Sequence, residues 1–99
     1  MSCGAPVQTL ELPPNVNTEV QSVLQGKVLT GQTPVAGAFV RLLDADGEFT
    51  AEVVSSPEGD FRFYAVPGTW TVRVLSRLGN GLTQLTIDTG VHSVDVHVG

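Results

Sequence analysis

Hydrophobic and polar residues alternate in short runs along most of this chain, and this period of two constrains the fold more than any other feature. The clearest run spans residues 61–65, in which Phe61 and Phe63 share one face while Arg62 and Tyr64 occupy the other. Further alternating runs cover residues 24–30, 38–42, 49–54, 70–74, 82–88 and 94–98. Short strands at this spacing predict an all-β sandwich of seven strands.

Turn signals separate these runs. Asp46-Gly47 predicts a hairpin, and further turns are predicted at Pro67-Gly68, Gly79-Asn80-Gly81 and Thr89-Gly90. No stretch has the period of an amphipathic helix longer than a turn or two.

The first 20 residues differ from the rest of the chain. They show neither helical nor strand periodicity, and Pro13-Pro14 favours extended backbone. A chain of 99 residues is too short for two domains with separate cores. We therefore predict an extended N-terminal arm over residues 1–20 and one β-sandwich domain over residues 21–99.

The side chains of one parity predict the hydrophobic core. They are Leu24, Val28, Ala38, Val40, Leu42, Val53, Phe61, Phe63, Trp70, Val72, Val74, Val94, Val96 and Val98. Burial of each large side chain contributes roughly 1.5–3 kcal/mol, which is enough in sum to support a domain of this size. Few apolar residues remain to line a pocket.

The charge of the chain excludes some classes of partner. Ten acidic and five basic residues give a formal net charge of −5, so phosphate backbones and anionic membrane surfaces are repelled. No apolar run is long enough to span a bilayer, and the N-terminus lacks the pattern of a signal peptide. A single cysteine forbids a disulfide within the chain. We predict a cytoplasmic protein that binds neither nucleic acid nor membranes.

Several of the alternating runs carry a likeness to a known family. The residues concerned are Gly26-Lys27-Val28, Gly37 to Leu42, Val53 to Phe63 and Pro67 to Val72. They resemble the carboxypeptidase regulatory-like domain, although Trp70 stands where that family usually has tyrosine. The resemblance implies a seven-stranded immunoglobulin-like or prealbumin-like β-sandwich. It also implies an accessory module without catalytic residues.

A closer likeness covers nearly the whole chain. It rests on Cys3-Gly4, Gly37 to Asp44, Glu48 to Val54, Gly59 to Phe63 and Val94 to Val96. These residues look like a small actinobacterial family of unknown function, some members of which are encoded beside thiosulfate sulfurtransferases. The resemblance implies a link to sulfur metabolism, with a thiosulfate sulfurtransferase as the candidate partner, and it directs attention to Cys3.

Cys3 is the one thiol of the sequence and is the candidate for sulfur chemistry. A persulfide carrier needs a fraction of thiolate, which a nearby cation or a helix N-terminus normally supplies. The nearest base in the sequence is Lys27, so the pattern favours an ordinary terminal cysteine. The thiol carrier, or docking partner of a sulfurtransferase, is the alternative hypothesis.

Other polar clusters do not form a catalytic or metal site. His92 and His97 lie five residues apart on one predicted strand, so they point to opposite faces. The acidic segment 44–48 contains Asp-Gly between alternating runs, which predicts a hairpin turn instead of a calcium loop. The chain also lacks a G-x-S-x-G elbow. We predict no catalytic residue, no metal and no cofactor, and therefore not an enzyme.

Four polar residues at outward positions form the candidate interaction surface. They are Arg41, Arg62, Tyr64 and Arg73, and both residue types are enriched at binding hot spots. The pattern favours an alternative in which the arginines pair across strands with Glu52 or Asp60. We predict a non-catalytic protein-interaction or accessory module. Exposed edge strands leave a homodimer open as a further alternative.

Overall fold

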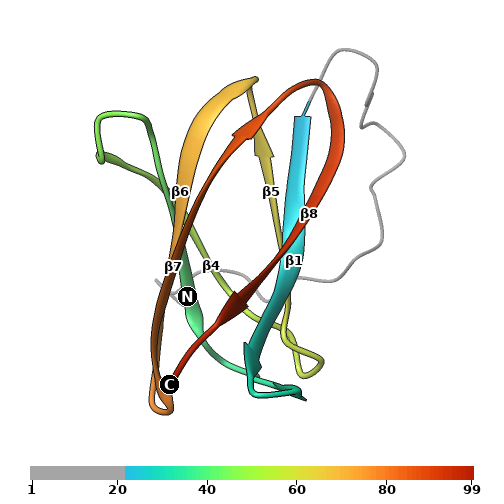
Figure 1. Ribbon diagram of the computed structural model, residues 1–99, viewed down its shortest axis with the longest axis vertical. Helices are drawn as coiled ribbons and strands as arrows, with labels where there is room; N and C mark the ends of the chain where they lie inside the picture. The colour runs from blue at the N-terminus through green and yellow to red at the C-terminus, as the bar shows by residue number, and fades with distance from the viewer. Residues whose placement is uncertain (1–21) are drawn as a thin grey trace, which may run out of the picture.

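The computed structural model describes residues 22–99, which form two β-sheets around one interior (Figure 1). The described residues form eight strands: β1 (Ser22–Thr30), β2 (Thr33–Pro34), β3 (Phe39–Leu43), β4 (Phe49–Val54), β5 (Asp60–Ala65), β6 (Gly68–Ser76), β7 (Gly79–Ile87) and β8 (Gly90–His97). The predicted all-β sandwich is confirmed. The eighth strand is the two-residue β2, which pairs with the end of β1.

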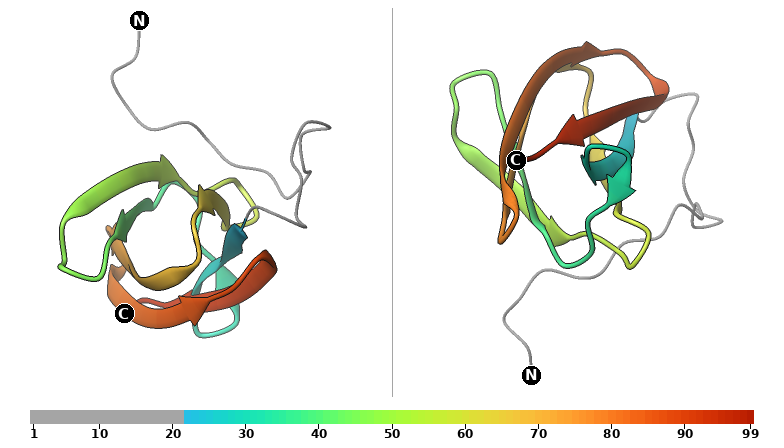
Figure 2. Two further views of the ribbon diagram at one scale, coloured as in Figure 1. Left: turned by 90° about the horizontal axis from the view of Figure 1, so that it is seen from above. Right: turned by 60° about the horizontal axis from the view of Figure 1, so that its bottom comes forward.

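The first sheet is built around β1. This strand pairs with β5 in antiparallel orientation and with β8 in parallel orientation. The second sheet has the antiparallel order β4-β3-β6-β7. The chain changes sheets between β7 and β8, and the strands curve around the shared interior (Figure 2). The outer faces of the two sheets therefore lie on opposite sides of the molecule.

The core follows the predicted parity. All the predicted core residues are buried except Val94, which is half-buried and packs against the others. Val35 and Ile87 join the core without having been predicted. The Trp70 ring is buried, and its Nε1 donates to the carbonyl oxygen of Val66 at 2.9 Å, so its polar atom is satisfied. Within residues 22–99, no helical segment has the length and hydropathy of a membrane span.

Two glycines allow β8 to cross close to its neighbours. A Cβ atom on Gly26 of β1 would overlap the carbonyl oxygen of Val94 and would lie 2.6 Å from its carbonyl carbon. A Cβ atom on Gly81 of β7 would lie 2.9 Å from Cγ1 of Val96. The close approach of β8 to β1 and β7 therefore depends on the absence of side chains at Gly26 and Gly81.

The turn predicted at residues 79–81 is wrong by two residues. The turn between β6 and β7 consists of Arg77 and Leu78, and Gly79 and Gly81 belong to β7. The physical reason is close packing: a Cβ on Gly79 would lie 2.6 Å from the Cα of Gly99. A glycine that permits close approach has the same sequence signal as one that permits a turn.

Candidate interaction surface

The four residues of the predicted interaction surface do not form one patch. Arg41 on β3 and Arg73 on β6 are direct register partners on the outer face of the second sheet. Arg62 and Tyr64 belong to β5, in the first sheet. The structure therefore brings together the first two residues and separates them from the other two.

The expectation that Arg62 is exposed is wrong. Its position alternates with the buried Phe61 and Phe63 as predicted, but Arg62 is only 3% exposed. Its Nε donates to Oε1 of Gln25 on the neighbouring strand at 3.2 Å. Tyr64 on the same strand is 49% exposed. Alternation predicts which face of a sheet carries a side chain, and it does not predict how closely that face is covered.

One arginine pairs across strands, as the sequence favoured. Arg41 Nε donates to Oε2 of Glu52 at 2.5 Å, between register partners of β3 and β4. Asp60 pairs instead with Lys27, whose Nζ lies 2.7 Å from Oδ1. The prediction of a cross-strand pair is confirmed for Glu52, while the partner of Asp60 is a lysine and not an arginine.

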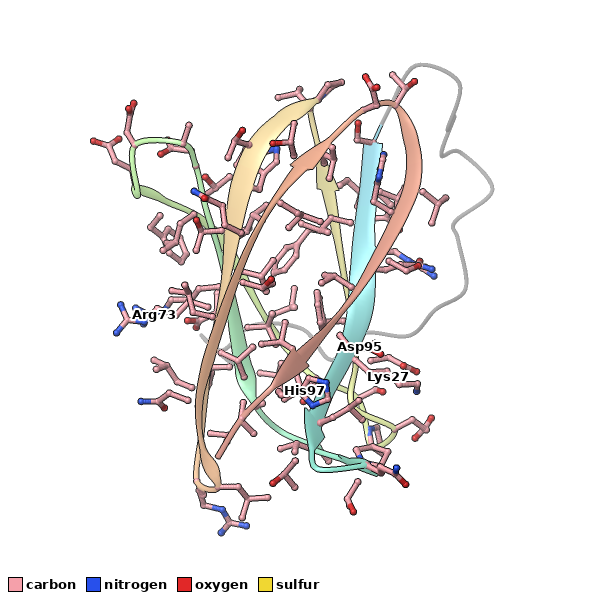
Figure 3. All side chains as sticks on the ribbon, viewed as in Figure 1. Lys27, Arg73, Asp95 and His97 are labelled. Atoms are coloured by element: carbon pink, nitrogen blue, oxygen red, sulfur yellow. The ribbon has the colours of Figure 1, made fainter. Side chains whose placement is uncertain are left out.

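Arg73 differs from Arg41 in its surroundings. It is exposed on the outer face and projects away from the sandwich (Figure 3). No carboxylate of residues 22–99 forms an ion pair with it. Its guanidinium is therefore available to a partner, with five donors in a planar fork.

Exposed apolar side chains surround Arg73. Phe39 is 47% exposed and is the register partner of the half-buried Leu75, while Leu82 is 64% exposed and is the register partner of Arg73. We call this outer surface of β4-β3-β6-β7 the arginine face. It comprises Phe39, Arg41, Glu52, Arg73, Leu75 and Leu82.

A groove lies at one end of the arginine face. It has a volume of about 260 Å³ and is lined by Gly37, Phe39, Leu75, Ser76 and Arg77. A second hollow of about 160 Å³ shares Gly37, Ser76 and Arg77 and continues to Leu78. We call the first of these the docking groove. Its lining is mainly apolar and includes the exposed Arg77, so it suits an apolar side chain next to an anionic group.

Sequence reasoning missed Phe39, Leu75 and Leu82 as surface residues. Each is a large apolar residue at an outward position of its strand, where alternation calls for a polar one. An apolar residue at the polar parity was therefore the available signal. A search for charged side chains at outward positions selects Arg41 and Arg73 and passes over these apolar neighbours.

The histidines and the acidic segment behave as predicted. His92 is half-buried, with Nε2 3.2 Å from the backbone nitrogen of Asp88, and His97 is exposed on the opposite face of β8. In the hairpin, Asp44 Oδ1 accepts hydrogen bonds from the backbone nitrogens of Asp46 at 2.9 Å and Glu48 at 3.0 Å. These bonds close a turn, as the Asp-Gly signal indicated.

The described residues contain no candidate site for metal or thiol chemistry. Among residues 22–99, no three His, Cys, Asp or Glu side chains gather in a group that could hold a metal ion. Lys27 of β1 faces Asp95 of β8 in the strand register, and both lie with His97 on the first sheet (Figure 3). The nearest interaction of Lys27 is its ion pair with Asp60. Cys3 lies outside the described residues.

The sequence matches a family and its mycobacterial relatives. A family model described as a protein of unknown function (DUF1416) matches residues 3–98. The uncharacterized protein Rv0814c of Mycobacterium tuberculosis is 51% identical over 98 residues, covering 97% of this chain and 98% of that protein. An uncharacterized protein of Mycolicibacterium smegmatis is 55% identical over 89 residues, covering 88% of this chain and 99% of that protein. The predicted likeness to a family of unknown function is confirmed.

Solved structures show the same fold at low identity. The 5-hydroxyisourate hydrolase of Klebsiella pneumoniae has a TM-score of 0.61 at 18% identity, covering 79% of this chain and 91% of that one. Chlorocatechol 1,2-dioxygenase of Pseudomonas putida has a TM-score of 0.64 at 14% identity, covering 99% of this chain and 68% of that one. At this identity the likeness concerns the fold, and it supports the predicted prealbumin-like β-sandwich.

Proposed function

This chain belongs to the DUF1416 family, and from that premise we propose that it is a non-catalytic accessory module that docks a protein partner through the arginine face. The observation that carries the proposal is the exposure of Phe39 and Leu82 around Arg73, an arginine without an ion pair among residues 22–99. Aromatic residues, phenylalanine among them, and arginine are enriched in protein interfaces, and arginine is also enriched among hot spots.

The energetics of this surface favour docking over solvent exposure. Large apolar side chains gain roughly 25 cal/mol for each Å² removed from water. Phe39, Leu75 and Leu82 lie on adjacent strands, so one partner surface can cover all three. Arg73 lies among them and adds orientation through directional hydrogen bonds.

The buried hydroxyls of Ser55 and Ser56 support a non-catalytic role because their hydrogen bonds serve the fold. Ser55 Oγ donates to the carbonyl oxygen of Val35 at 2.7 Å and accepts from the backbone nitrogen of Ala38 at 2.9 Å. Ser56 Oγ accepts from the backbone nitrogen of Asp60 at 3.1 Å. Ser55, directly after β4, thus holds the segment that leads into β3, and Ser56 holds the turn between β4 and β5.

Site-specific photocrosslinking in cells of the native host tests the proposal. A photoreactive residue replaces Leu82 on the arginine face, and a matched one replaces Val91, which is 45% exposed on β8 of the other sheet. We expect a discrete crosslinked protein from position 82 and none of the same mass from position 91. Equal products from the two positions, or no product from position 82, would contradict the proposal.

The link to sulfur metabolism is a hypothesis that rests on the sequence alone. A thiosulfate sulfurtransferase is one candidate for the crosslinked partner, and mass spectrometry of the crosslinked product identifies it directly. The thiol-carrier hypothesis needs Cys3 and not the arginine face. Mutations of Cys3 and mutations of the arginine face therefore distinguish the thiol carrier from the docking module.

A further inference from the structure

We propose that the arginine face binds an acidic protein segment, which places an apolar side chain in the docking groove and carboxylates on Arg73 and Arg77. This inference rests on the proposed function and names the chemistry of the partner. The segment has the pattern acid-x-apolar-x-acid in extended conformation.

The distribution of charge supports an acidic partner. The chain has five basic residues and a net charge of −5, yet Arg41, Arg73 and Arg77 all lie on the arginine face or beside its groove. The Debye length is about 8 Å at physiological ionic strength, so a docked carboxylate senses these arginines more than the distant acids. The local surface is therefore attractive to anions although the whole chain is acidic.

Two of the three arginines are available to such a partner. Arg41 is held by Glu52, the nearest carboxylate on the face. Within the described part of the chain, neither Arg73 nor Arg77 forms an ion pair. Guanidinium groups bind carboxylates in bidentate geometry, which gives both affinity and orientation.

The spacing of the groove defines the pattern of the segment. Arg73 and Leu75 lie two residues apart on the outer face of β6, and Arg77 follows in the turn directly after β6, where it lines the groove. Two residues of a strand span about 6.8 Å. An extended partner that lies over the outer face of β6 thus places a carboxylate at Arg73 and an apolar side chain two residues further on at Leu75, and its next outward residue, a second carboxylate, reaches Arg77 in the turn.

The volume of the docking groove suits a side chain. About 260 Å³ lies below the range of roughly 300–1,000 Å³ typical of pockets for small molecules and cofactors. Phe39 and Leu75 line it from adjacent strands, and Gly37 contributes no side chain. An aliphatic or aromatic side chain of a protein partner fits this shape and polarity.

A second copy of this chain is a poorer occupant. Arg41 and Arg73 are register partners near the middle of the face. A two-fold axis that pairs this face with itself brings the arginines of both copies together. Like charges facing each other across an interface are destabilising. Charge complementarity therefore points to a different, acidic protein.

Fluorescence anisotropy with defined peptides tests the inference on the full chain. Four labelled heptapeptides share a serine background: one with glutamates two residues before and after a central leucine, one with glutamines there, one with lysines there, and one with glutamates around a central serine. The glutamate–leucine peptide is expected to bind at least about tenfold more tightly than each of the others, which equals about 1.4 kcal/mol.

Charge reversal provides the second half of the test. The double variant Arg73→Glu, Arg77→Glu is expected to prefer the lysine peptide, while Ser93→Glu on β8 leaves the wild-type preference unchanged. Four results would overturn the inference: equal binding of all four peptides, no binding of the glutamate–leucine peptide up to 1 mM (about −4.1 kcal/mol), an unchanged preference in the double variant, or self-association that the double variant abolishes. A crosslink from position 82 together with any of the first three leaves the proposed function standing and removes only the acidic partner.

Discussion

A methyl group added at Gly26 should disrupt the packing of β8 on β1. In Gly26→Ala the new Cβ would overlap the carbonyl oxygen of Val94 and lie 2.6 Å from its carbonyl carbon and 3.1 Å from Cζ of Phe61. Carbon atoms pack without repulsion at about 3.5–4.0 Å. The backbone of β8 must therefore retreat by at least about 1 Å.

The cost follows from the hydrogen bonds between the two strands. β8 pairs with β1 in register from Ser22–Gly90 to Leu29–His97. A hydrogen bond of about 2.9 Å that lengthens by 1 Å no longer counts as one. Losing two such bonds at about 1 kcal/mol each, with about 1–3 kcal/mol for overpacking, destabilises the fold by about 3–5 kcal/mol.

Thermal and urea denaturation, followed by circular dichroism, measure this effect. A loss of about 3 kcal/mol lowers the melting temperature by roughly 12–24 °C for a domain of this size. Gly31→Ala is the matched control, because a Cβ there meets nothing within 4 Å and the cost is only its positive φ of 61°. That left-handed conformation costs an alanine about 1–2 kcal/mol.

Hydrogen exchange distinguishes the two mechanisms. Gly26→Ala should accelerate hydrogen exchange of the β8 amides around Val94 by more than its loss of global stability explains. Gly31→Ala should accelerate exchange of these amides only as much as its own loss of global stability requires. A Gly26→Ala protein that loses less stability than Gly31→Ala would refute the argument from close approach.

Further predictions address single interactions. Ser55→Ala leaves the buried nitrogen of Ala38 and the carbonyl oxygen of Val35 without their side-chain partner, so we expect a loss of about 1–3 kcal/mol in urea denaturation. A loss below about 0.5 kcal/mol would contradict that role. Glu52→Gln removes a partly exposed ion pair with Arg41 and should cost only about 0.2–1 kcal/mol, less at high salt. For the thiol hypothesis, intact-mass spectrometry after incubation with thiosulfate and an active sulfurtransferase should show one added sulfur on the wild type and none on Cys3→Ser, and no gain on either would reject the carrier.

Alternation predicted the interior of the fold well because it reports a local property. Side chains at one parity share a face whatever strands lie beside them, so Phe61, Phe63 and Trp70 could be assigned to the core from sequence. The half-buried Val94 is the exception, and it lies where β8 crosses Gly26.

The candidate site was harder to predict because it depends on strand order. Arg41, Arg62 and Arg73 all occupy outward positions, but β5 lies in the other sheet, so Arg62 is separated from the remaining two. Strand order is set by packing between segments distant in sequence, which a local pattern does not encode. For the same reason, the docking groove between Phe39 and Leu75 becomes visible only when β3 and β6 are paired.

The most direct test of the account is the crosslink from position 82 in an Arg73→Glu background. If the partner docks through the arginine face, charge reversal at Arg73 should abolish the crosslinked product while the circular dichroism spectrum and melting temperature remain those of the parent. A crosslinked product of unchanged mass and yield in the Arg73→Glu protein would contradict the central claim that this face binds the partner.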